Sequence, residues 1–263
     1  MRSSVERAEA GRAPSRGRRI AFRIIATVVG ASGAAFGLFT AVFGIISEDQ
    51  RVHAFHNTVV ASLLLVLSAP PALMAARAPE RSSRALVHLA VLGVAGVVTM
   101  GLALTIDPFT LPVIVLIGVL WLLRPRQERP VPAGRPSAIL LVLVVAAAVP
   151  LTAYALTHAE LQRTDSTSEH AEFYHWVETS FYAASILLLG LLAALQPAAY
   201  RFSAWSAGLA LAILGGGSLL LGDYVSALDT SWAWAALAGG IVFVGVAEWE
   251  FRRSARRTGA ARA

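Results

Sequence analysis

The residue types that could do chemistry in this sequence are histidines and carboxylates, and they gather in two short segments, 48–57 and 169–179. In the first segment, His53 and His56 are three residues apart and therefore share one face of a helix. Glu48 precedes them in the same segment. Neutral imidazoles beside carboxylates are typical ligands of zinc, copper or iron. Metal binding is therefore one chemistry that this segment indicates.

The second segment places Glu172, His175 and Glu178 at intervals of three residues, so they also follow one helix face. Glu178 lies about two turns inside an apolar run. A carboxylate at that depth in a membrane is costly, and it normally faces the interior of the helix bundle or a cavity. Glu178 is for this reason the first residue to which we assign a functional role.

A metal site made of His56, His175 and Glu178 would be a set of two histidines and one carboxylate. The spacing is a weak signal, because the sequence holds no H-E-x-x-H motif. Haem held between His56 and His175 is disfavoured, since the expected outer face offers only Arg51 and Arg163 to pair with propionates and carboxylates crowd the site. The cofactor stays open, with a transition metal as one reading.

Two other chemistries fit the same residues. Histidine and glutamate could relay protons or pass a small cation, or a membrane-embedded enzyme could use Glu178, Asp107 or Asp223 as a general acid or base, with or without a metal. A structural or partner-binding subunit is a further alternative. Our leading prediction is the binding or transport of a small cation, proton or small solute. The expected site is an outward-facing cavity lined by His53, His56, His175, Glu178, Asp107 and Asp223.

The elements that must position these residues are membrane helices. The chain has 263 residues, of which 56% are hydrophobic and 14% charged, and the apolar residues form long runs. Runs of about 20 apolar residues span a bilayer as helices. The fold class is therefore all-α, a polytopic integral membrane bundle of about eight helices. They are expected at 24–47, 54–76, 85–106, 109–123, 138–157, 172–195, 203–222 and 231–250.

The arginines orient this bundle. With the N-terminus in the cytoplasm, 20 of the 22 arginines fall on the cytoplasmic side, and only Arg51 and Arg163 do not. We therefore expect a protein of the plasma membrane with both termini cytoplasmic. The Arg-rich tails, a disordered 1–19 and 251–263, would contact anionic lipid headgroups, and no nucleic-acid partner is expected. Five of the six histidines then lie on the outer side.

The two halves of the chain, 20–124 and 138–250, show a similar helix rhythm around a Pro/Arg linker at 125–137. A shift of about 119 residues places His56 on His175 and brings Asp107 close to Asp223. Four helices are an even number, so a duplication would give two halves of the same orientation, a parallel repeat. Identity between the halves is low, which leaves duplication and a shared rhythm as alternatives.

Several classes of protein are excluded or disfavoured by missing residues. The sequence has no cysteine, which excludes thiolate ligands and thiol nucleophiles, and no lysine, which excludes a Schiff base. It holds neither a Walker A motif nor a Gly-x-Ser-x-Gly nucleophile elbow. His88 stands alone toward the cytoplasmic side, so we expect an interface or loop role for it. Glu248 and Arg252 are expected to pair at i,i+4.

Overall fold

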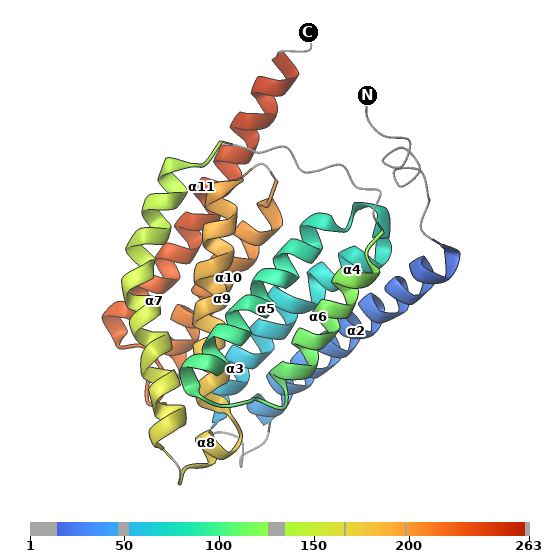
Figure 1. The fold of residues 1–263 in the computed structure, drawn as a ribbon. Coiled ribbons are helices and arrows are strands. Elements are labelled where there is room, and N and C mark those ends of the chain that lie inside the picture. The colour runs from blue at the N-terminus through green and yellow to red at the C-terminus, as the bar shows by residue number, and fades with distance from the viewer. Residues whose placement is uncertain (1–14, 47–52, 126–134, 166, 198, 261–263) are drawn as a thin grey trace.

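The computed structural model describes residues 15–46, 53–125, 135–165, 167–197 and 199–260, and every long element in them is a helix (Figure 1). The elements are α2 (Arg16–Ile46), α3 (Ala54–Ser62), η2 (Leu63–Ser68), α4 (Ala69–Arg77), η3 (Pro79–Arg81), α5 (Ser83–Ala103), α6 (Thr110–Leu123), α7 (Ala138–Thr164), α8 (Glu169–Glu172), α9 (His175–Leu195), α10 (Arg201–Leu220) and α11 (Thr230–Ala260).

The predicted polytopic helical bundle is confirmed. Seven helical spans in the described residues are long and apolar enough to cross a membrane, with α3, η2 and α4 together forming the second of them. The predicted fourth membrane helix exists as α6, but it has 14 residues and is shorter than the roughly 20 that a full span needs. At the ends, α2 begins at Arg16 and α11 runs to Ala260, so parts of both predicted tails are helical.

The centre of the bundle is formed by α9 and by the span 54–77. The most apolar stretches of these two spans are 72% and 61% buried, whereas that of α7 is only 22% buried. The order of burial is similar in the two halves, because the first span of each half is poorly buried and the second is the best buried. This order agrees with the proposed repeat, which stays a prediction. The two segments that carry the candidate site therefore begin the two most enclosed helices.

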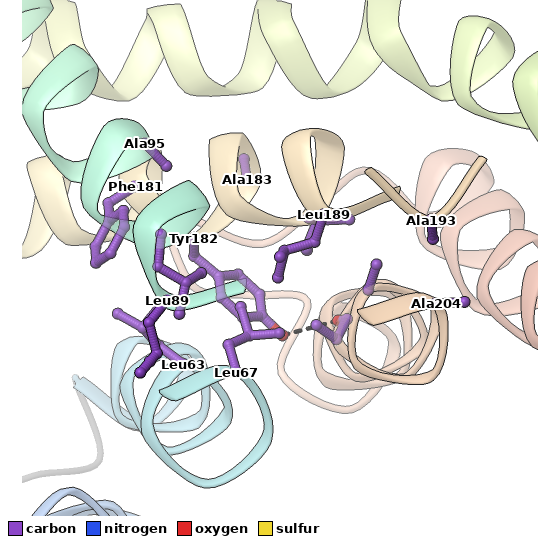
Figure 2. Close-up of a cluster of buried hydrophobic side chains, with 14 of the residues drawn as sticks. Leu63, Leu67, Leu89, Ala95, Phe181, Tyr182, Ala183, Leu189, Ala193 and Ala204 are labelled. Carbon is purple, nitrogen blue, oxygen red and sulfur yellow. Dashed lines mark hydrogen bonds between the residues drawn. The ribbon is translucent and has the colours of Figure 1, made fainter. Parts of the chain in front are cut away.

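Tyr182 of α9 ties three helices together at the centre. Its hydroxyl donates to the Ala210 carbonyl of α10 at 2.8 Å and lies 2.6 Å from the hydroxyl of Ser62 on α3. The phenol has a single proton, so Ser62 is the donor in the second hydrogen bond. Figure 2 shows the Tyr182 ring among Leu67, Leu89 and Leu189. This buried hydroxyl pair fixes how α3, α9 and α10 meet.

The second span is irregular, and its prolines explain why. Pro71 has no N–H, so the carbonyl of Leu67, four residues earlier, has no helical donor. Nε2 of His88, on α5, lies 2.8 Å from that carbonyl and donates to it, because a carbonyl can only accept. Nδ1 of His88 then accepts from the Ser203 hydroxyl of α10 at 2.9 Å. His88 is fully buried at this helix interface.

Helices α10 and α11 pack closely through glycines. A Cβ atom at Gly215 would lie 2.4 Å from the Ala233 carbonyl oxygen, and one at Gly240 would lie 2.4 Å from the Gly208 carbonyl oxygen. Backbone atoms at that distance cannot yield, so small residues are required there. At the end of α11, the predicted pair of Glu248 and Arg252 is confirmed at 3.1 Å, and Arg201 of α10 joins it.

Candidate metal centre

Two helix starts bring the site residues together. His53 directly precedes α3, and His56 lies in its first turn. On the other side, the short helix α8 ends at Glu172, and Tyr174, the residue directly before α9, has a φ of 64°, in the left-handed region. That conformation costs a residue other than glycine on the order of 1–3 kcal/mol. The turn at Tyr174 starts α9 with His175 and Glu178 in its first turn.

His56, His175 and Glu178 converge at the boundary between α3 and α9, and we call them the inner triad. Nε2 of His56 lies 2.9 Å from a carboxylate oxygen of Glu178, and the two side chains are 6% and 13% exposed. The rings of His56 and His175 stack with centroids 3.6 Å apart. One ligand atom from each member lies within 4.8 Å of the others. The proximity required for a shared site is therefore present.

A second group, His53, His170 and His175, is called the outer triad. Its ligand atoms also lie within 4.8 Å of one another, and the three ring centroids are separated by 4.8 to 5.4 Å. Glu169 approaches His53 Nε2 at 3.5 Å from an exposed position. His170 was not among the predicted site residues, although it lies in the segment 169–179. His175 belongs to both triads and links them.

Several nitrogens of these histidines are buried without a partner. Nδ1 of His53, His56 and His175 has no hydrogen bond in the structure. A buried polar atom normally has a partner, and leaving one without a partner costs about 1–3 kcal/mol. Three such atoms within one cluster are what a set of ligand atoms around an ion would show. The donor set itself, imidazole and carboxylate, also suits a transition-metal ion.

The connection between α7 and α9 holds the outer histidines in place. The Asp165 carboxylate accepts from the hydroxyl and backbone N–H of Ser168 and, at 3.1 Å, from Nε1 of Trp176. The hydrogen bond from the Ser168 hydroxyl is the main reason why the pKa of Asp165 lies below its usual value. Gln162 bonds the backbone of Ala171 at 2.9 Å. Sequence reasoning missed the contacts of Asp165 with Trp176 and of Gln162 with Ala171, because these partners are 11 and 9 residues apart along the chain.

His170 lies at the exposed side of the cluster and outside the membrane-spanning helices. Partial burial, followed by the neighbouring His53, lowers the pKa of His170 below the usual 6.5. The neutral imidazole is therefore favoured, and this is the form that binds metals. The ring of His170 also stacks on Trp176, with centroids 4.9 Å apart. The ring is thus held next to His53 and His175 in a form competent to bind an ion.

The remaining predicted residues, Asp107 and Asp223, belong to neither triad. Asp107 is fully buried, but its carboxylate accepts from the backbone N–H groups of Phe109 and Thr110 and from the Thr110 hydroxyl. It caps the start of α6 and lies close enough to Glu178 for their charges to interact. Asp223 is exposed in the connection between α10 and α11, outside both triads. Glu48, Asp49 and Arg51 lie outside the described residues.

The geometry bears on two of the alternatives. Rings stacked 3.6 Å apart leave no space for a porphyrin between His56 and His175, since each axial nitrogen must lie on an opposite side of the iron. Around Tyr182, the core is filled by the fully buried side chains of Leu67, Leu89 and Leu189 (Figure 2). This part of the bundle is closely packed in this conformation.

No protein-family model, curated protein or solved structure matches this chain. The assignment of the site consequently depends on the geometry of its own residues.

Proposed function

We propose that this chain is a membrane protein that binds a transition-metal ion through His56, His175 and Glu178. The observation that carries the proposal is the convergence of these three side chains at a nearly enclosed position, with the Nδ1 atoms of both histidines left without a partner. A cation there would neutralise the Glu178 carboxylate, which is otherwise costly to keep inside a membrane bundle.

The distances suit an ion after a small adjustment. Ligand atoms about 2.1 Å from a tetrahedral ion are roughly 3.4 Å from one another. The ligand atoms of the inner triad already lie within 4.8 Å of one another, so side-chain movements of about 1 Å would bring all three to coordination distance from one ion. Zinc accepts two histidines and one glutamate and keeps a fourth position open. Neither triad contains a sulfur ligand, which favours Zn(II), Cu(II) or Ni(II) over Cu(I).

The outer triad gives the ion a route to the inner one. His53 and His170 lie at the end of the bundle that the arginine distribution predicts to face outward. An acidic, His-rich surface attracts cations and repels anions. We therefore propose capture by the outer triad, followed by transfer to the inner triad through His175. The buried leucines around Tyr182 favour binding over a permanently open pore.

The test uses the full-length protein, purified in detergent and stripped of metal with a chelator. Zn(II) is titrated by calorimetry, and Co(II) is titrated by its visible absorption, whose intensity reports tetrahedral coordination. We expect stoichiometric binding that Glu178→Gln weakens at least tenfold, because the substitution removes the only charged ligand. Glu160→Gln is the matched control, since Glu160 is an exposed carboxylate at the same end of the bundle and outside both triads.

Two results would overturn the proposal. One is that monodisperse, folded protein fails to bind Zn(II) or Co(II) stoichiometrically when it is titrated. The other is equal affinity in Glu178→Gln and Glu160→Gln, which would place any bound ion elsewhere.

A further inference from the structure

A long groove runs along the second half of the bundle, away from the histidines. Helices α7 and α11 form its walls, α9 and α10 form its floor, and its volume is about 580 Å³. Figure 1 shows α7, α10 and α11 at the same side of the molecule. Small residues such as Gly190 and Gly239 leave the space open, because no side chain projects from them. The size is that of a pocket for one small ligand.

The groove opens toward the bilayer. Beside it, Val145 and Val149 of α7 are 69% and 77% exposed, and Ile241 of α11 is 62% exposed. Such apolar surfaces on membrane-spanning helices face lipid hydrocarbon. An apolar cavity does not hold water, since water there would lose its hydrogen bonds. Hydrocarbon from the surrounding membrane is therefore the available occupant.

We propose that this groove binds one acyl chain of a membrane phospholipid. The lining of α7 runs from Leu143 to Thr157, which is about 21 Å at 1.5 Å per residue and is somewhat longer than one leaflet of a core roughly 30 Å thick. A volume of about 580 Å³ is within the range of pockets that hold one small ligand, and an elongated apolar shape suits a single hydrocarbon chain.

The polarity of the groove gives the chain a direction. Polar groups line only one end, where Thr157, Asp229 and the Tyr154 hydroxyl lie, and the Tyr154 hydroxyl donates to the Ser226 carbonyl at 2.6 Å. Trp232 lies at the same end, which suits a position at the membrane interface. The opposite end is closed by Leu143 and Phe243. The phospholipid headgroup consequently lies at the Asp229 end and the methyl end at Phe243.

The test places the full-length protein in nanodiscs of phosphatidylcholine and phosphatidylglycerol that carry phosphatidylcholine with a diazirine near the end of one acyl chain. After irradiation, mass spectrometry locates the adducts. We expect adducts on Leu187 of α9 and Leu211 of α10, which line the floor of the groove. In Ala236→Phe, whose new ring fills the groove, these adducts should fall at least fivefold. Ala238→Phe is the matched control, because Ala238 is exposed on α11 and does not line the groove.

Two outcomes would overturn the inference. Adducts confined to the outward faces of α7 and α11, with none on Leu187 or Leu211, would show ordinary annular lipid and leave the groove to another occupant. Equal labelling of Leu187 and Leu211 in Ala236→Phe and Ala238→Phe would place the chain elsewhere. Neither result depends on metal binding.

Discussion

His88 and the pair of His56 and His175 are buried at two places in this bundle, and they differ in what their ring nitrogens contact. His88 uses both nitrogens, one on the Leu67 carbonyl and one on the Ser203 hydroxyl. His56 and His175 are stacked on each other, and each leaves Nδ1 buried without a partner. Burial alone would place all three in one class. The nitrogen contacts separate a histidine that holds helices together from histidines that are free to bind a ligand.

The difference has a free-energy basis. A satisfied buried imidazole contributes to folding, whereas an unsatisfied one costs about 1–3 kcal/mol unless a ligand compensates. The unpartnered nitrogens of the inner triad therefore lower the folding free energy gain, and a bound ion can remove this cost. The nitrogens of His88 carry no such cost. Mutations should affect binding at one end of the bundle and stability at the other.

The largest effect is expected for His175→Ala, because this residue belongs to both triads. Affinity for Zn(II) should fall on the order of a hundredfold or more, beyond the 10- to 100-fold typical of losing a supporting residue. The melting temperature of the metal-free protein should change little. Calorimetry and thermal unfolding measure the two quantities. An unchanged affinity with a lowered melting temperature would remove the distinction between the two groups of histidines.

The reciprocal variant is His88→Ala. It leaves the Leu67 carbonyl and the Ser203 hydroxyl without their partner in a fully buried position, so unfolding should become easier by about 3 kcal/mol. Affinity for Zn(II) should stay within a factor of two in the fraction that folds. Unfolding in mixed detergent micelles gives the first quantity. A folded His88→Ala protein that has lost metal binding would show that His88 acts in the site.

A smaller effect tests why His88 is needed. Pro71→Ala restores an N–H four residues after Leu67, so the helix itself can satisfy the carbonyl that His88 now serves. In the Pro71→Ala background, His88→Ala should cost about 1 kcal/mol less than in the wild type. A double-mutant cycle of unfolding free energies measures this coupling. Strict additivity of the two substitutions would refute the role assigned to Pro71.

The smallest effect concerns the loop that carries His170. The pKa of Asp165 is lowered, chiefly by the hydrogen bond from the Ser168 hydroxyl. The hydrogen bonds of the Asp165 carboxylate to Ser168 and Trp176, which we call the Asp165 clamp, therefore stabilise the fold fully above the usual carboxyl pKa of 3.8. This stabilisation is lost as the pH falls through the lower pKa of the folded state. Asp165→Asn at pH 7 should therefore resemble the wild type at a pH below the lowered pKa of Asp165. Hydrogen exchange of segment 162–177 reports the loosening. Protection that is insensitive to both changes would contradict the clamp.

Much of the fold followed from the sequence, because hydrophobic runs and arginine positions are local signals. Glu178 could be singled out because a carboxylate inside an apolar run is costly anywhere in a membrane. The Asp107 cap could have been found too, since Asp107 and Thr110 stand three residues apart at a helix start. His170 could not, because its approach to His53 depends on the left-handed turn at Tyr174.

His88 shows a second limit of sequence reasoning. The Leu67 carbonyl that its ring satisfies lies 21 residues away along the chain, and only the packing of α5 against the second span brings the two together. The apolar groove could not be predicted for the same reason, since its walls and floor come from four helices whose separate sequences show no sign of it. Features that depend on a partner helix become visible only once the helices are placed.

The sharing of His175 between the two triads has a consequence for how much the site can hold. Both triads include His175, and a neutral imidazole has one nitrogen with a free lone pair, so it can bind an ion in only one triad at a time. Under the metal proposal, the two positions are mutually exclusive and the capacity is one ion. A second ion can therefore bind only after the first has dissociated, so saturating metal should give a stoichiometry of one ion per chain.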